Sequence, residues 1–215
     1  MKKYSFVIIL ILLITACSEP GASDLEQAKR LMTGDSLTVA DTAQAMEHLT
    51  LAAESGNAEA MYRLAYYRQY GIGTEKNSEE ALNLYRRSAE AGYDKAQNKM
   101  GMVYYTGSGT GQDYGAARKW FIKSAKGGND QAQYMLGKIY SAGKGIEPDT
   151  ARAVKWLKKS VKGGHPYPQF LLGKLLYERA ESPEDLEKAR HWIEKSADQG
   201  VGHAKALLEQ LPADK

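Results

Sequence analysis

The chain has 215 residues, of which 43% are hydrophobic and 26% are charged, and its formal net charge is +3 at pH 7. This is the balance of an ordinary soluble globular protein, and the length suits one domain. Because Cys17 is the only cysteine, the composition excludes an intrachain disulfide.

The first 17 residues form a segment of their own. Lys2 and Lys3 precede an apolar run over residues 6–14, which is followed by Thr15, Ala16 and Cys17. Nine apolar residues are too few to cross a hydrocarbon core of about 30 Å. The run therefore predicts the central part of a signal peptide and not a membrane span.

The residues from Ile14 to Cys17 resemble the lipobox of bacterial lipoproteins. The resemblance implies cleavage after residue 16, with acyl chains such as palmitate on the Cys17 thiol and on its new amino group. Two or more chains make membrane attachment stable. Residue 18 is Ser and not Asp, and by the same resemblance this implies that the lipoprotein lies in the outer membrane of a Gram-negative cell and faces the periplasm. The alternative is an ordinary secreted protein with a chance cysteine.

Residues 17–23 contain Pro, Gly and Ser and predict a short tether before a folded part over residues 24–215. Within that part the sequence repeats every 36 residues. Copies lie near 58–93, 94–129, 130–165 and 166–201, with partial copies at both ends. The repeated columns include Gly56, Gly92, Gly128, Gly164 and Gly200, and also Trp120, Trp156 and Trp192. A period of this size predicts an array whose neighbouring copies bury a shared core.

The stretch GKIYSAGKG, residues 137–145, invites comparison with a nucleotide-binding P-loop. Its glycine spacing is one residue too long, and Gly145 stands where the motif needs Ser or Thr. The pattern Gly-x-Gly also recurs at Gly71, Gly107 and Gly143. The stretch is therefore interpreted as one copy of a connector.

Each copy has apolar residues at helical spacing in two segments, exemplified by residues 130–143 and 149–163, which predict two antiparallel helices. The second helices are expected to begin near polar capping residues: Asp41, Asn77, Asp113, Asp149 and Asp185. Asn77 with Glu80, and Asp41 with Gln44, have capping-box spacing. In the fourth copy Ser182 is expected to begin the helix. Shorter helices are expected over 24–32 and 202–210.

This pattern resembles the Sel1-like repeat over residues 41–210. The residues that carry it are the pairs Ala96-Gln97, Ala132-Gln133 and Leu136-Gly137, then Tyr140, the Gly143-x-Gly145 connector, and Ala153 with Trp156. The resemblance implies an all-α, TPR-like solenoid of helix-turn-helix repeats with a right-handed superhelix, and a protein-binding scaffold. The fourth copy departs from the pattern at Pro168 and over residues 178–182.

The first helices vary between copies at the positions that do not belong to the repeated columns, and these positions are rich in tyrosine. They are expected to face a groove and bind a partner, because rigid aromatic rings are favoured interface anchors. Alternatively, the tyrosines pack between helices with only a hydroxyl exposed. The predicted partner-binding residues are Tyr62, Tyr66, Tyr70, Asn98, Met102, Tyr105, Tyr134, Lys138, Phe170, Lys174 and Tyr177.

Charge is unevenly distributed along the chain. Residues 115–174 contain 12 Lys or Arg against 3 Asp or Glu, whereas residues 18–114 contain 9 against 14. A clustered positive field steers association with acidic proteins or anionic lipid head groups. A simple solvated face is the alternative. Nucleic acid is not expected, because an exported protein without a recognisable binding module gives no reason for it.

No residue pattern predicts catalysis. The four histidines, His48, His165, His191 and His203, lack zinc-ligand spacing, and no metal or cofactor is expected. The sequence favours a noncatalytic envelope lipoprotein that binds another envelope or secreted protein. One specific version is an immunity protein against a secreted effector. The alternative is an envelope hydrolase acting on cell-wall or β-lactam substrates. The oligomeric state is left open.

Overall fold

The computed structural model describes residues 19–33 and 38–212, so the predicted signal peptide and Cys17 lie outside the described residues. Within these ranges the chain forms α-helices and one short 3-10 helix, and no strand. The predicted all-α solenoid is confirmed. The helices are α1 (Ala22–Leu31), α2 (Val39–Glu54), α3 (Ala58–Tyr70), α4 (Ser78–Glu90), α5 (Asp94–Thr106), α6 (Tyr114–Lys126), α7 (Asp130–Ala142), α8 (Thr150–Ser160), α9 (Pro166–Tyr177), α10 (Pro183–Asp198) and α11 (Gly202–Leu208), with η1 at Val161–Gly163.

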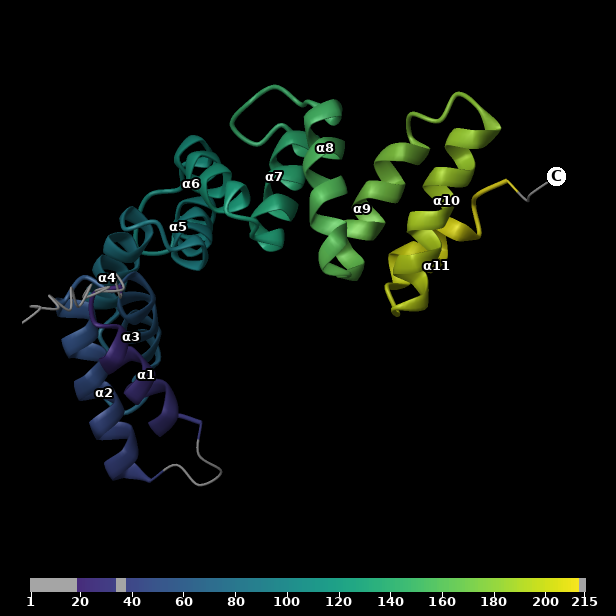
Figure 1. Cartoon of the computed structure of the whole chain (residues 1–215). Helices are drawn as coiled ribbons and strands as arrows, with labels where there is room; N and C mark the ends of the chain where they lie inside the picture. Colours follow the sequence, from purple (N-terminus) through teal and green to yellow (C-terminus); the bar gives the residue numbers. More distant parts are fainter. Residues whose placement is uncertain (1–18, 34–37, 213–215) are drawn as a thin grey trace, which may run out of the picture.

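Consecutive helices pair as hairpins, and the hairpins follow one another along a curved row (Figure 1). Helices α1 and α2 lie at one end of the arch, and α11 packs on α10 at the other end. Helix α5 contacts α7, which is the first helix of the next hairpin. Around the middle of the arch α5 lies on the inner side of α6 (Figure 1). Helices α5 and α7, the first helices of two consecutive hairpins, are therefore in contact near the middle of the arch.

Side-chain caps begin the second helices, as the sequence predicts. Asn77, Asp113 and Asp149 each accept a hydrogen bond from the backbone N–H three residues later. Ser182 caps α10, with Pro183 in the first helical position. Asp41 lies within the first turn of α2, as expected, but its capping box is formed with Thr38 and not with Gln44. Thr38 is the N-cap, and the Asp41 carboxylate accepts from the Thr38 N–H, which is the return bond of a capping box.

The Gly-x-Gly connectors need a left-handed backbone. Gly143 and Gly145 both have φ of 65° in the turn between α7 and α8. A Cβ on Gly145 would lie 2.7 Å from the Cβ of Tyr114, so glycine also permits a close approach. This turn joins two helices, and no strand precedes it. The connector interpretation of residues 137–145 is confirmed.

The buried side chains form three successive clusters along the row: one over α1 to α5, one over α6 to α9, and one at α10, α11 and the residues that follow. Glycines on the first helices let each hairpin close tightly. A Cβ on Gly101 would lie 2.5 Å from Phe121, and a Cβ on Gly137 would lie 2.6 Å from Leu157. Small residues on one helix thus make room for large ones on its partner.

The two ends of the array differ from the expected boundaries. Helix α1 begins at Ala22, inside the segment expected as a tether, because Gly21 adopts φ of 67° and lies against Ala52. The fourth copy keeps the hairpin geometry despite its altered connector. Gly173 lies against Ile193, just as Gly137 lies against Leu157.

Candidate functional site

The predicted partner-binding residues all lie on the first helices α3, α5, α7 and α9. Their exposure differs strongly. Tyr66 and Tyr70 are 44% and 56% exposed, and Lys174 is also exposed. The others are half-buried: Tyr62, Asn98, Met102, Tyr105, Tyr134, Lys138, Phe170 and Tyr177. The predicted surface is therefore a set of partly packed side chains with its most exposed rings on α3.

Six tyrosines gather around α3. Tyr66 and Tyr70 lie with ring centroids 4.7 Å apart, and Tyr66 also contacts Tyr67 edge-on. Tyr62 lies 5.4 Å from Tyr85 of α4 and 5.3 Å from Tyr93, the N-cap of α5. We call this group the tyrosine cluster: Tyr62, Tyr66, Tyr67, Tyr70, Tyr85 and Tyr93. It extends from α3 and α4 to the N-cap of α5, where the next repeat begins.

Four rings of the tyrosine cluster are buried or half-buried, and the rings of Tyr66 and Tyr70 are exposed. Burial raises the pKa of Tyr62, and the phenols of Tyr66 and Tyr70 add to the effect. Burial likewise raises the pKa of Tyr93 to about 12, with the charge of Glu59 contributing. These phenols are neutral hydrogen-bonding groups at neutral pH. Tyr66 contacts both the half-buried Tyr67 and the exposed Tyr70, so Tyr66 and Tyr70 present aromatic surface that loses little side-chain entropy on binding.

A second group of aromatic residues lies on the first helices α5, α7 and α9. Tyr105 of α5 contacts Tyr114 edge-on with ring centroids 5.3 Å apart. Burial raises the pKa of Tyr134 of α7, and the neighbouring phenols of Tyr167 and Tyr105 raise it further. Tyr134 also lies under the ammonium of Lys138 at 5.6 Å. Tyrosines of three consecutive first helices are therefore close neighbours.

The remaining predicted residues mostly make contacts within the fold. Phe170 stacks on His203 with centroids 6.3 Å apart, and both Phe170 and Tyr177 pack against the terminal hydrophobic cluster. Met102 packs against the central cluster. The Oδ1 atom of Asn98 is buried and has no hydrogen-bond partner among the described residues. Lys174 forms an ion pair with Glu178 at 3.7 Å.

The basic excess of residues 115–174 lies largely on two second helices. Exposed lysines at i, i+4 and i+7 form a stripe on α6, and the residues 36 positions later continue it on α8 and η1: Lys119, Lys123, Lys126, Lys155, Lys159 and Lys162. Lys123 lies over Trp120 at 4.3 Å, and Lys159 lies over Trp156 at 4.7 Å. Within residues 19–33 and 38–212 none of these lysines forms a salt bridge.

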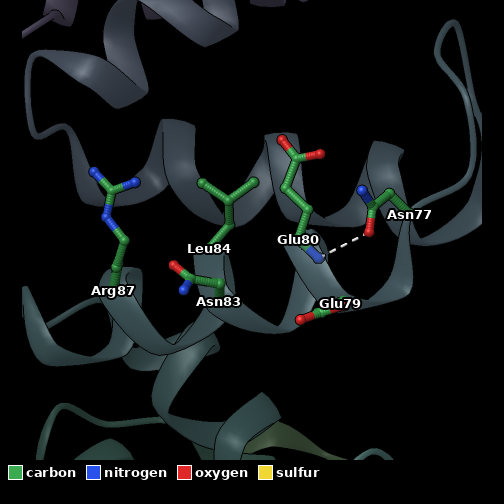
Figure 2. Close-up of a pocket in the computed structure, with 6 residues that line it drawn as sticks. All are labelled: Asn77, Glu79, Glu80, Asn83, Leu84 and Arg87. Carbon is green, nitrogen blue, oxygen red and sulfur yellow. Dashed lines mark hydrogen bonds between the residues drawn. The ribbon is translucent and has the colours of Figure 1, made fainter.

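A polar hollow on α4 is the other surface feature that invites a chemical interpretation (Figure 2). Its lining comes from one helix and its N-cap, and the Glu79 and Glu80 carboxylates point in different directions (Figure 2). Glu80 forms an ion pair with Arg68. The Glu80 Oε1 atom lies 3.4 Å from Arg68 Nε, but the two atoms do not form a hydrogen bond. The lining includes no serine, cysteine or histidine nucleophile. This arrangement gives no support to acid–base hydrolysis.

The histidines have structural surroundings. His48 pairs with Asp24 at 3.0 Å, and His165 pairs with Asp130 at 3.2 Å. His191 contacts Trp192 edge-on. Across the part of the chain that the structure describes, no three or more His, Cys, Asp or Glu side chains are arranged to hold a metal ion. No described helix has the length and apolarity to span a membrane.

Sequence reasoning missed three residues of the tyrosine cluster: Tyr67, Tyr85 and Tyr93. Tyr93 occupies an N-cap position where the neighbouring copies have the capping residues Asn57 and Asn129. A tyrosine in place of a capping residue could have been recognised in the sequence as a residue kept for another role. Tyr85 was missed because its ring contact with Tyr62 depends on how α3 and α4 pack together.

A family model described as Sel1 repeat matches residues 28–57, 58–93, 94–129, 130–165 and 169–201, which is more than half of the chain. A search of curated proteins gave no match. Among solved structures, the chain is similar to a Sel1 repeat protein from Oxalobacter formigenes. The identity is 27% and the TM-score 0.76, over 90% of this chain and 79% of that one.

Two further solved structures are similar. One is a protective antigen of uropathogenic Escherichia coli with an SLR fold, at 32% identity and a TM-score of 0.77. The match covers 88% of this chain but 41% of the antigen, so this chain spans less than half of the antigen's length. The other is an immunity protein from Pseudomonas aeruginosa, at 23% identity and a TM-score of 0.51, over 86% of this chain and 67% of that one. This second likeness shows the fold alone.

Proposed function

Because the chain belongs to the Sel1 repeat family, we propose that it is a noncatalytic scaffold that binds another protein through the inner face of its first helices. The observation that carries the proposal is the pair of exposed rings, Tyr66 and Tyr70, held 4.7 Å apart at the open edge of the tyrosine cluster. Preorganised aromatic rings of this kind dominate binding energies in protein interfaces. The tyrosines Tyr105, Tyr134 and Tyr167 extend the surface toward α9.

Capture of a partner from cell-envelope extracts tests this proposal. The double variant Tyr66→Ala, Tyr70→Ala should lose capture at least tenfold, since each interface anchor contributes about 2 kcal/mol or more. Leu51→Ala is the matched control, because Leu51 is similarly exposed at 45% but lies on α2, outside the first helices that form the inner face. Equal capture by the double variant and the wild type would contradict the proposed surface.

Membrane attachment forms part of the same proposal. The lipobox-like residues that end at Cys17, followed by Ser18, support a lipoprotein of the bacterial outer membrane that faces the periplasm. Metabolic labelling with an alkyne analogue of palmitate tests it. Wild-type protein should carry the label and partition into the membrane, whereas Cys17→Ala should do neither. An unlabelled wild-type chain would contradict lipid attachment.

The more specific version is immunity, in which the partner is a secreted effector. A similar protein of Pseudomonas aeruginosa is described as an immunity protein, and a rigid tyrosine-rich surface suits tight capture of one cognate protein. Cells that produce the chain should survive an effector-delivering competitor better than cells that produce the Tyr66→Ala, Tyr70→Ala variant. Equal survival of the two strains, together with partner capture in extracts, would favour general scaffolding over immunity.

A further inference from the structure

A small pocket of about 310 Å³ lies between the first and second repeats, where α3, α4, α5 and the connector after α5 meet. Its lining combines apolar side chains with hydroxyl, amide and ammonium groups. The lining residues are Gln69, Ser78, Ala81, Leu82, Tyr85, Lys99, Val103, Ser108 and Gly109. Polar groups from two adjacent hairpins line the pocket, so a ligand bound there could form hydrogen bonds with both.

Lys99 is the one charged side chain of the pocket lining. It is half-buried, and its ammonium nitrogen lies 5.1 Å from the ring centroid of Tyr85. Burial lowers the pKa of Lys99, and no carboxylate offsets this effect. Among the residues that the structure describes, Lys99 has no ion-pair partner. A partly desolvated ammonium without a counter-ion is unfavourable and would be stabilised by an anion.

The repeat shows that the fold does not require a cation at this position. In the next two copies the corresponding residues are apolar: Met135 is buried, and Leu171 packs against the central cluster. In the preceding copy the corresponding residue is Arg63, which pairs with Glu59 one turn earlier at 2.6 Å. The residue that corresponds to Glu59 in the second copy is Lys95. Lys99 therefore keeps the basic group of the first copy but lacks its carboxylate.

The other polar groups of the pocket suit the same kind of ligand. The Tyr85 hydroxyl donates to Gln69 Oε1 at 3.1 Å, which fixes the ring beneath the ammonium. Ser108 Oγ accepts a hydrogen bond from Thr106 at 2.9 Å, so its own proton is directed away from Thr106. Leu82, Val103 and Ala81 are the apolar side chains of the lining. A carboxylate with a short aliphatic stem matches both the ammonium and the apolar side chains.

We propose that this pocket binds a carboxylate on a short aliphatic stem, paired with Lys99 and with its stem against Leu82 and Val103. Two sources supply this chemistry: a free short-chain carboxylate, or a glutamate or aspartate side chain of a bound protein. The free ligand goes beyond the scaffold function and does not depend on it. The protein source rests on the proposed scaffold function and gives the partner an acidic residue.

NMR titration of the full chain with butyrate, at constant ionic strength maintained with sodium chloride, tests the site. The amide signals of Val103, Ser108 and Gly109 and the side-chain signals of Lys99 should shift saturably. Lys99→Met should abolish these shifts, and it is expected to fold because Met135 occupies the same place in the next copy. Lys95→Met is the matched control on the same helix, and it should leave the titration unchanged.

A second titration with a hexaglutamate peptide distinguishes the two sources. Binding about tenfold tighter than butyrate, lost in Lys99→Met and kept in Lys95→Met, assigns the pocket to an acidic side chain of a protein. Saturable butyrate binding without a gain from the peptide assigns it to a free carboxylate. The proposal is overturned if neither probe gives a saturable shift, or if Lys99→Met shows the same shifts as the wild type. Partner capture by the Tyr66→Ala, Tyr70→Ala variant is measured separately from these titrations. The scaffold proposal and the pocket proposal can therefore be contradicted independently of each other.

Discussion

Ser124 on α6 donates a hydrogen bond of 2.7 Å from its Oγ to the backbone carbonyl oxygen of Asp94, the first residue of α5. Every complete hairpin repeats this bond across 30 residues of sequence. The equivalent pairs are Ser88 with Ala58, Ser160 with Asp130, and Ser196 with Pro166. All four serines are 0% exposed. The bond fixes the late part of each second helix to the start of its first helix.

Replacing Ser124 with alanine should lower the free energy of unfolding by about 1 kcal/mol, which is typical for the loss of one buried hydrogen bond. Urea unfolding followed by circular dichroism measures the change. Lys126→Ala is the control, because the Lys126 side chain on the same helix is exposed. A Ser124 variant as stable as the wild type would show that the bond adds nothing beyond the packing of the hairpin.

Gly137→Ala should destabilise the array by about 1–3 kcal/mol, because the added methyl group would lie 2.6 Å from Leu157 in a hairpin that is already closely packed. Gly202→Ala is a matched control, since a Cβ there meets nothing within 4 Å and helix α11 begins at that residue. Alanine is the better helix former, so the control variant should be at least as stable as the wild type. Equal effects of the two substitutions would contradict the close-approach explanation.

Much of the fold was predictable because the repeat displays each structural requirement several times. Asn77, Asp113 and Asp149 recur at one spacing and cap their helices, and the recurring Gly143 and Gly145 adopt the left-handed backbone. The Asp41 column placed Asp41 correctly in the first turn of α2, but it did not identify Thr38 as the N-cap. A capping box can place the acidic residue at its third position, and Thr38 competes for the cap.

The candidate surfaces were predictable only in part. The column pattern identified Tyr66 and Tyr70, because varied positions on the first helices are those that the shared core does not use. It did not separate them from Phe170, which stacks on His203 of the last helix. It also did not identify Lys99, since its isolation depends on the distance between its side chain and every carboxylate in the folded chain. Such distances come from the packing of repeats and not from their period.

Glu59 makes part of the stability dependent on pH. Burial would raise its pKa, yet hydrogen bonds and charges from Arg63 and Lys29 outweigh burial and hold the pKa below the ordinary value of 4.5. A carboxyl group whose pKa is lower in the folded state stabilises the fold above the unfolded pKa. That contribution is lost as the pH falls below 4.5 and through the folded value.

Glu59→Gln should therefore lower the free energy of unfolding by roughly 0.5–1 kcal/mol near neutral pH, the range of partly exposed ion pairs. The difference from the wild type should shrink on acidification below the unfolded pKa. Urea unfolding at several pH values measures it, and Glu54→Gln at an exposed position is the control. A difference that stays constant with pH would contradict the ion-pair explanation.

Lys99→Met should raise the urea midpoint at neutral pH, since it removes a partly desolvated ammonium from a position where the next copy buries Met135. Burial lowers the pKa of Lys99, so the cost of its charge is fully present at neutral pH. It disappears as the pH rises toward the unfolded value of 10.5. The advantage of the variant should therefore narrow above neutral pH. A lower midpoint for Lys99→Met than for Lys95→Met would show that Lys99 stabilises the fold.

Site-specific photo-crosslinking in living cells tests the central claim most directly, because it shows which face of the arch touches the partner. A benzoylphenylalanine group at position 70, at the end of the first helix α3, is compared with the same group at position 126, on the lysine stripe of α6. The scaffold account predicts that position 70 crosslinks to one envelope or secreted protein and that position 126 does not. Crosslinks to a protein from position 126 alone would place the binding surface on the basic outer helices and contradict the account.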